Sequence, residues 1–468
     1  MSARKIGFLI LILGFGAAVE TSWSIRESRV FFGPEGCRVL GGRFYGPSFT
    51  FEETTEAPLP EGEIPRVEVR NEFGDVVVAT GEGPGLRVRL RKVVYQPTEE
   101  KAREFASGIE LRLDSDGERL RVGTNRDEVG RGRHVGFETH LEVTAPPAVT
   151  VDVRNEHGAV EVRGVAGAKV RTSFGDTRIE DVTGAVSLET RHGAVHAEKL
   201  GAALTIDARH GDVTLGGVAG SADLKVEHGS VTARGTAGLS ARVSFGGFTA
   251  EGVGGDLTVR SSHGAVSAAD VTGRADAETS FAGIELRRVG KDARTKSQHG
   301  AVVASAIGGA FTAQTSHGRV ELERVEGPVE VRVENGAVEA RSLRKGALLR
   351  ASGGDVSIDG FEGPIDVAVE RGDVRLLTSA PIVESLSASA TGGGIRLEVP
   401  AGSRFELEAE SRHGELHMGL PGSETIAADA GGRSRATATV GGGGAQARVI
   451  ADGDVAIEPH SPALAEAP

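Results

Sequence analysis

The sequence predicts an all-β protein of the β-solenoid class, in which short strands wind around one axis and each coil stacks on the one before it. Three observations lead to this prediction. A unit of about 18 residues recurs through most of the chain, glycine recurs at two places in each unit, and apolar and polar residues alternate between the glycines. Repeats of this kind contact their neighbours along the axis. We expect a right-handed, parallel β-helix-like coil, because parallel crossovers are right-handed by default.

The repeating unit consists of an alternating strand, a polar pair, His-Gly and a second short strand, as in LETRHGAVHA, IDARHGDVTL and VRSSHGAVSA. Successive turn glycines are 17 or 18 residues apart, and the one double step, from Gly264 to Gly300, has Phe281-Ala282-Gly283 at its middle. Glycine supplies the positive φ that tight turns need. The predicted turn glycines are Gly158, Gly175, Gly193, Gly211, Gly229, Gly246, Gly264, Gly300, Gly318 and Gly336.

Two architectures fit a strand–turn–strand–turn unit. One is the solenoid, with equivalent residues stacked about 4.8 Å apart. The other is an antiparallel meander of hairpins, for which Asn335-Gly336 would make a good turn. Phe174, Phe245 and Phe281 replace His in the turn column, and Phe is a poor occupant of a positive-φ hairpin position. A meander would also form one wide layer that cannot bury its inner face, so the solenoid is favoured.

The N-terminus reads as a secretory signal peptide. Arg4 and Lys5 precede an apolar run from Ile6 to Val19, and small residues allow cleavage after Ala18. The run is shorter than a membrane-spanning helix requires. We therefore expect an extracytoplasmic protein, in the periplasm, on the cell surface or secreted, and an N-terminal membrane anchor if the signal is not cleaved.

The regions outside the regular repeats predict different structures. PTEEKAREFASG reads as a short helix near residues 97–108, with Thr98 as N-cap and Gly108 as its end. The aromatic stretch before the repeats is either a cap or a loose stalk. The predicted regions are a signal peptide (1–18), an aromatic N-terminal segment or cap (19–64), an N-terminal β region with the short helix (65–150), the solenoid (151–420), a C-terminal β cap (421–459) and a disordered tail (460–468).

Composition excludes several classes of partner and site. The formal net charge is −13 and no basic block is present, which argues against nucleic-acid binding. Cys37 is the only cysteine, so an intrachain disulfide and a multi-cysteine zinc site are both impossible. No stretch after the signal is apolar enough to span a membrane.

A column of aromatic residues before the turn glycine is the unusual feature of this chain. Stacked imidazoles about 5 Å apart could share a metal ion or act as a pH switch. A structural role is favoured, because Phe takes the same place three times, and no metal or cofactor is predicted. The column consists of His157, Phe174, His192, His210, His228, Phe245, His263, Phe281, His299 and His317.

A parallel β-helix enzyme acting on polysaccharides is the main catalytic alternative. Such chemistry needs clustered carboxylates and loops long enough to form a cleft. The residue after the turn glycine varies instead, as in Asp176, Ala194, Asp212 and Ser230, and the repeats keep a nearly constant length between 150 and 370. These Asp residues are interpreted as turn formers, and the chain is predicted not to be an enzyme.

Several features together resemble the putative-adhesin family of bacterial envelope proteins with β-strand repeats, a family of unknown function. They are the exported N-terminus, the early unit VEVRNEFGDVVV, the bridging segment HLEVTAPPAVTVDVRNEHGAVEV, the repeated x-x-G-[DAS]-V turns and the closing ARVIADGDVAI, over about residues 60–459. The resemblance implies a solenoid-like β fold, an extracytoplasmic setting and no established catalytic residues. The family favours Ser or Asn before the turn glycine, where this chain repeatedly has His.

These observations predict an exported, non-catalytic adhesin-like or structural envelope protein, whose rigid repeat surface binds a glycan, the cell wall or a protein. An alternative is a sensory or assembly module of the envelope-stress machinery, which would bind a protein through one end of the coil. A polysaccharide-active enzyme is the third possibility. The sequence does not name the ligand.

Overall fold

The structure is a computed structural model, and it describes residues 39–40, 43–44, 47–59, 66–117, 119–130, 135–421, 424–426 and 432–460. The predicted signal peptide and residues 461–468 of the predicted tail lie outside these ranges. The chain forms two compact units. The first contains residues up to 52 with 91–110 and 125–138, and the second contains 53–90, 111–124 and the chain from 139 onward. None of the helices in the described ranges has the length and apolar character needed to cross a membrane.

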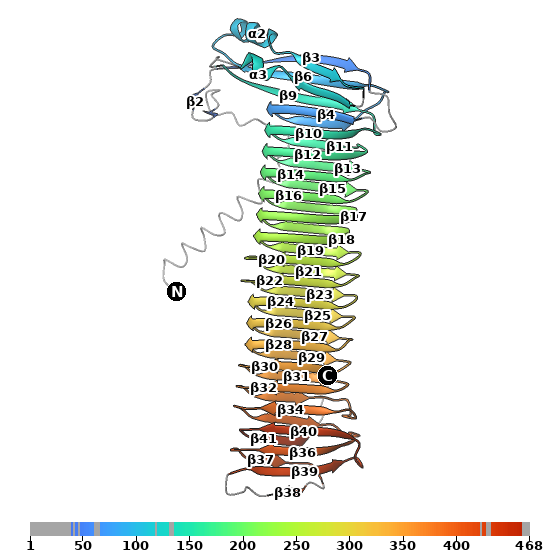
Figure 1. The fold of residues 1–468 in the computed structure, drawn as a ribbon, viewed down its shortest axis with the longest axis vertical. Coiled ribbons are helices and arrows are strands. Elements are labelled where there is room, and N and C mark those ends of the chain that lie inside the picture. Colours follow the sequence, from blue (N-terminus) through green and yellow to red (C-terminus); the bar gives the residue numbers. More distant parts are fainter. Residues whose placement is uncertain are drawn as a thin grey trace, which may run out of the picture. The chain divides into compact units, whose positions relative to one another are not determined.

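The second unit is a β-solenoid of about 14 turns with about 18 residues per coil, as predicted. Each coil contributes one strand to a first wall, which ends at the aromatic turn column, and one strand to a second wall, which begins just after it (Figure 1). Each strand pairs in parallel with the equivalent strand of the next coil; in one such pair Val186 lies opposite Leu204 and His192 opposite His210. This pairing excludes the antiparallel meander for the stacked coils.

Two strands run through both walls, namely β17 (Val213–His228) and β18 (Val231–Phe245). The other strands of the first wall are β4 (Arg66–Phe73), β10 (Thr150–His157), β12 (Gly167–Phe174), β14 (Val186–His192), β16 (Leu204–His210), β20 (Leu257–Ser261), β22 (Ala275–Thr279), β24 (Ala293–His299), β26 (Phe311–His317), β28 (Val329–Asn335), β30 (Ala347–Ala351), β32 (Ile365–Val369) and β34 (Leu386–Ala390). Those of the second wall are β5 (Val76–Thr80), β11 (Val160–Arg163), β13 (Thr177–Val182), β15 (Val195–Leu200), β19 (Phe248–Val253), β21 (Val266–Val271), β23 (Ile284–Val289), β25 (Val302–Ile307), β27 (Val320–Val325), β29 (Val338–Leu343), β31 (Val356–Phe361), β33 (Val374–Leu377) and β35 (Ile395–Val399).

The core lies between the two walls and consists of the alternate residues that point inward. In the coil formed by β14 and β15, the buried residues are Val186, Leu188, Thr190, Val195, Ala197 and Leu200, and the strand residues that alternate with them are more exposed. Each wall therefore has one dry and one wet face, as the alternating sequence predicts. Burial of these small aliphatic columns supplies the main stabilisation of each coil.

The turn glycines are required by close contact as well as by conformation. At Gly175 the backbone φ is +135°, and a Cβ atom there would lie 2.1 Å from the carbonyl oxygen of Gly158 in the neighbouring coil. The same contact recurs along the column, because parallel stacking brings each turn directly over the previous one. A side chain at this position would therefore force two coils apart.

The second wall ends in a left-handed residue that sequence reasoning did not predict. In β15 the outward residues Glu198 and Lys199 are consecutive, and the chain turns inward again at Leu200 because Lys199 has a φ of 53°. This conformation costs a non-glycine residue about 1–2 kcal/mol. Glycine takes the equivalent position in only some coils; the non-glycine residues there are Asp181, Lys199, Asp270, Arg288, Ala306, Arg324 and Ser342.

Near its N-terminal end the solenoid departs from a simple repeat. The coil of β4 and β5 stacks directly on β10 and β11, although about 70 residues separate them in sequence. On its other side it pairs with β8 (Arg119–Thr124) and β9 (Gly136–Ala145), and β7 (Leu111–Ser115) pairs antiparallel with β8. The remaining N-terminal strands are β1 (Val39–Leu40), β2 (Arg43–Phe44), β3 (Ser48–Ala57) and β6 (Leu86–Tyr95).

At the C-terminal end the order of stacking differs from the order of sequence. The last strand pair, β40 (Ala445–Ala451) and β41 (Val455–Pro459), inserts between β34 and β35 on one side and β36 (Phe405–Ser411) and β37 (Leu416–Met418) on the other. β39 (Ser434–Val440) then pairs antiparallel with β36 and with β38 (Glu424–Ile426). Antiparallel strands thus end the parallel stack, which limits edge-to-edge association.

The predicted short helix is present as α2 (Glu99–Ser107) in the first unit. Thr98 is its N-cap, with its hydroxyl accepting a hydrogen bond from the Lys101 backbone nitrogen, and Gly108 ends it. A second helix, α3 (Arg126–Val129), was not predicted, because a single turn leaves little periodic signal. Within this unit Phe105 packs edge-on against Phe137, whose ring also lies under the Arg126 guanidinium.

Adjacent glycines in one turn allow a test of the stacking contact. A Cβ atom at Gly246, where φ is +141°, would lie 2.1 Å from the Gly229 carbonyl oxygen, whereas one at Gly247 would meet nothing within 4 Å. We expect Gly246→Ala to lower the free energy of unfolding by roughly 2–4 kcal/mol and Gly247→Ala to change it by less than about 1 kcal/mol. Urea denaturation midpoints measure both. Equal midpoints for the two variants would contradict the close stacking.

Candidate binding surface

An aromatic ladder runs along the corner where the first wall meets the second. We use this name for eleven rings that stack face to face, with centroids 4.3–5.5 Å apart and ring planes within 18° of parallel. In-register pairing places each ring directly over its counterpart in the next coil. The members are Phe73, His157, Phe174, His192, His210, His228, Phe245, His263, Phe281, His299 and His317.

The ladder brings together all ten residues that the sequence placed in the turn column and adds one more. Phe73 was missed, because residues 81–149 separate its coil from the regular repeats. The sequence does contain evidence that Phe73 belongs to the column, since RNEFG at residues 70–74 closely matches RNEHG at 154–158. After His317 the same turn position holds Asn335, so the row of rings ends there.

Stacking determines which parts of the rings are available to a ligand. Each inner ring has both of its faces covered by its two neighbours, so the ladder presents ring edges to solvent. Phe174, Phe245 and Phe281 are 46%, 47% and 56% exposed, respectively, and are among the few large apolar side chains exposed in the described parts of the chain. A sugar ring therefore cannot stack on the inner rings, and only hydrogen bonds to imidazole edges or apolar contacts to Phe edges are possible.

Metal binding by the ladder is disfavoured by the same geometry. The nitrogen lone pairs of an imidazole lie in the ring plane, so the lone pairs of parallel rings such as His192 and His210 do not converge on one point. A different set of side chains does converge. Glu180, His196 and Glu198, on the outward face of the second wall, have ligand atoms within 4.8 Å of one another. The Arg178 guanidinium already pairs with Glu180, and His196 Nε2 lies 2.8 Å from Glu198 Oε1.

The Asp residues after the turn glycine connect neighbouring coils. The Asp176 carboxylate accepts a hydrogen bond of 2.9 Å from the Ala194 backbone nitrogen, and Asp212 accepts one of 2.8 Å from Ser230. The Asp75 carboxylate likewise accepts a hydrogen bond from the Ala159 backbone nitrogen. These carboxylates are therefore held by backbone N–H groups that parallel strand pairing leaves free at the corner.

A buried carboxylate with three arginines lies near the N-terminal end of the solenoid. Glu68 is on β4 and is only 5% exposed, although it points away from the core. Its Oε1 lies 2.6 Å from Arg70 Nη2 and 3.6 Å from Arg154 Nη2, and its Oε2 lies 3.6 Å from Arg121 Nε. Burial raises the pKa of Glu68, but the hydrogen bond from Arg70 and the charges of Arg70, Arg154 and Arg121 outweigh it, so the pKa lies below its ordinary value.

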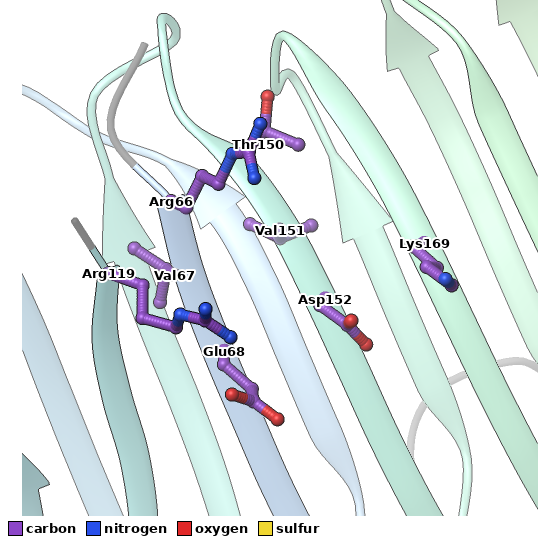
Figure 2. Close-up of a pocket in the computed structure, with 8 residues that line it drawn as sticks. All are labelled: Arg66, Val67, Glu68, Arg119, Thr150, Val151, Asp152 and Lys169. Carbon is purple, nitrogen blue, oxygen red and sulfur yellow. The ribbon is translucent and has the colours of Figure 1, made fainter. Parts of the chain in front are cut away.

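Glu68 also lines a shallow hollow of about 530 Å³ on the outward face of the first wall (Figure 2). Figure 2 shows basic and acidic side chains from neighbouring strands on this one face, with the Arg66 side chain extending toward Thr150. Sequence reasoning did not find this hollow, because its residues come from four separate strands, β4, β8, β10 and β12. The lining residues are Arg66, Val67, Glu68, Arg119, Thr150, Val151, Asp152 and Lys169.

Comparison with known families supports the repeat assignment. Residues 249–458 match the model of the family described as Toastrack DUF4097, which confirms the resemblance to a β-repeat family of unknown function. No curated protein matches the chain. Among solved structures, a putative cell adhesion protein from Clostridium sporogenes ATCC 15579 aligns with 88% of this chain and 100% of its own length, at 7% identity and a TM-score of 0.17. A TM-score this low supports no inference about the function of this chain.

The structural interpretation of the ladder stays a prediction, and Phe245 offers a test of it. This ring stacks between His228, at 4.8 Å, and His263, at 4.6 Å. Phe245→His keeps a planar ring and should change the free energy of unfolding by less than about 1 kcal/mol, whereas Phe245→Leu should lower it by about 1–2 kcal/mol through two lost ring pairs. Thermal melts at pH 8 measure both. If the Leu variant is as stable as the His variant, stacking contributes nothing.

Glu68 predicts an acid-sensitive contribution to stability. Because its pKa in the folded state is below the ordinary value of 4.5, the contribution is fully present above about pH 4.5 and is lost as the pH falls through the lower folded-state pKa. Glu68→Gln leaves three arginines without their carboxylate and should lower the free energy of unfolding at pH 7 by about 1–3 kcal/mol.

Denaturation of wild type and Glu68→Gln at pH 7 and pH 3 measures this difference, which should shrink at the lower pH. Glu251→Gln is the control, since Glu251 forms an exposed pair with Arg234 at 3.5 Å and should have a small effect at both pH values. A difference between wild type and Glu68→Gln that is unchanged at pH 3 would show that the carboxylate charge is not the cause.

Proposed function

We propose that this chain is an exported, non-catalytic adhesin-like or structural protein of the cell envelope, whose rigid repeat surface binds a glycan, the cell wall or another protein. The observation that carries the proposal is the unbroken in-register stack from β10 to β34 (Figure 1). Such a stack offers a long, preordered surface, so that binding costs little conformational entropy. Export is inferred from the basic and apolar N-terminal sequence.

The outward faces support a binding role, because their charged residues are held in position by neighbouring coils. Lys225 Nζ lies 3.1 Å from Asp207 Oδ2, and Lys296 Nζ lies 3.1 Å from Glu278 Oε1, each pair joining adjacent strands of the first wall. Exposed pairs of this kind add little stability. They do fix the side chains that a partner would meet, which favours specific contact at low entropic cost.

The non-catalytic part of the proposal is supported by what the carboxylates do. In a polysaccharide-active β-helix, acidic residues on neighbouring coils would face a cleft and reach the substrate. Here Asp176 and Asp212 accept backbone hydrogen bonds that join one coil to the next. Such carboxylates already have a structural partner.

The proposal predicts both where the chain lies in the cell and what kind of partner can be crosslinked to it. In native cells the chain should fractionate with the envelope or the medium and be degraded by protease added outside the cytoplasmic membrane. Crosslinking in those cells should capture an envelope glycan or protein, and the purified chain should leave a panel of polysaccharides uncleaved. Cytoplasmic, protease-resistant chain would refute the proposal, and measurable polysaccharide turnover would replace it with the enzymatic alternative.

A further inference from the structure

The hollow near the N-terminal end of the solenoid lies within a concentration of positive charge, which we call the cation patch. Its seven basic residues come from neighbouring strands of the first wall, β8, β4, β10 and β12, in register. Arg154, for example, lies opposite Arg70 on one side and Arg171 on the other. The cation patch consists of Arg66, Arg70, Arg119, Arg121, Arg154, Lys169 and Arg171.

The cation patch has fewer acidic partners than it has basic residues. Among the described residues, the acidic partners of its arginines are Glu68, Asp116, Asp152 and Glu189. Glu68 serves three arginines at once. Arg66 and Lys169 are exposed, line the hollow and have no ion-pair partner within the described part of the chain. The patch therefore carries an excess of positive charge on a protein whose net charge is −13.

Like charges in consecutive coils destabilise a parallel stack, because side chains in register are close neighbours. Elsewhere on the first wall some cations meet a carboxylate in the next coil, as Lys225 meets Asp207, and others follow one another, as Lys225, Arg242 and Arg260 do. At the patch, Arg70, Arg154 and Arg171 also follow one another, and the hollow beside them is lined by two further cations, Arg66 and Lys169. An anionic ligand in the hollow would supply the missing countercharge.

The lining of the hollow indicates which kind of anion fits. Arg66 and Lys169 can bind carboxylate groups, and a guanidinium can do so through two hydrogen bonds. The Thr150 hydroxyl and the Asp152 carboxylate can accept hydrogen bonds from neutral hydroxyl groups. A ligand with both carboxylates and hydroxyls matches both sets, whereas a closely spaced phosphate chain would be repelled by Asp152 and Glu68. The volume of about 530 Å³ suits a short segment of a longer chain lying across the wall.

We propose that the hollow bounded by Arg66, Thr150, Asp152 and Lys169 binds a segment of an acidic, uronate-containing polysaccharide. This inference rests on the proposed function, since it names the class of glycan that the repeat surface binds. Binding is expected to weaken as the salt concentration rises, because the cations are exposed.

The experiment measures affinity by isothermal titration calorimetry for three uronate polymers: polygalacturonate, alginate and hyaluronate. Fully methyl-esterified polygalacturonate is the neutral control ligand, and single-stranded DNA is the phosphate-chain control. The double variant Arg66→Ala/Lys169→Ala removes the two cations of the patch that have no ion-pair partner among the described residues. Arg242→Ala/Arg294→Ala is the matched control, since it removes the same charge from exposed outward positions of the same wall. Circular dichroism melts check that both variants fold.

At least one uronate polymer should bind, and the hollow variant should weaken its binding by about 10- to 100-fold, since each charge-assisted hydrogen bond is worth roughly tenfold in affinity. The control variant should change affinity by less than about threefold, and the methyl ester should not bind. Absence of binding to all three polymers, equal losses in both variants, or equal affinity for the ester or DNA would overturn the inference. Capture of another envelope partner in cells would leave the proposed function standing in any of these cases.

Discussion

In-register parallel pairing between successive coils is the constraint on which the rest of this structure depends. Each strand bonds to its equivalent in the next coil, so any residue type that recurs at one place in the repeat becomes a continuous column. Columns of Val, Leu and Ala form the core. Where two turns must lie in direct contact, the column is glycine, because a Cβ atom would strike the carbonyl oxygen of the coil beside it.

The same constraint explains the aromatic ladder and the Asp residues beside it. A ring at the corner repeats at nearly the strand spacing of about 4.8 Å, which is close to the distance at which flat rings stack. Imidazole and phenyl rings fill the position interchangeably because both are planar. The neighbouring corner leaves backbone N–H groups without strand partners, and Asp176 or Asp212 accepts a hydrogen bond from the next coil there.

Electrostatics on the outward walls follow from stacking as well. Opposite charges in consecutive coils pair along the axis in places, as Lys225 does with Asp207, and like charges follow one another in others, as Lys225, Arg242 and Arg260 do. At the N-terminal end of the first wall, arginines surround Glu68 and further cations line a hollow. A hollow lined by exposed cations is where an anionic partner is most readily accommodated on this wall.

The sequence by itself determined the repeat length, the all-β class, the two-walled coil and ten of the eleven members of the aromatic ladder, because each rests on periodicity within neighbouring units. It also predicted α2, whose cap residues Thr98 and Gly108 act locally. Only the tertiary structure showed that β4 stacks on β10, that β40 inserts beside β34, and that Arg66 and Lys169 line one hollow. These contacts join segments far apart in the chain, and their pairing is decided by edge strands and charges that have no fixed spacing in sequence. The sequence also did not predict the left-handed residues such as Lys199, because stacking of the coils, and not the residue type, imposes that backbone conformation.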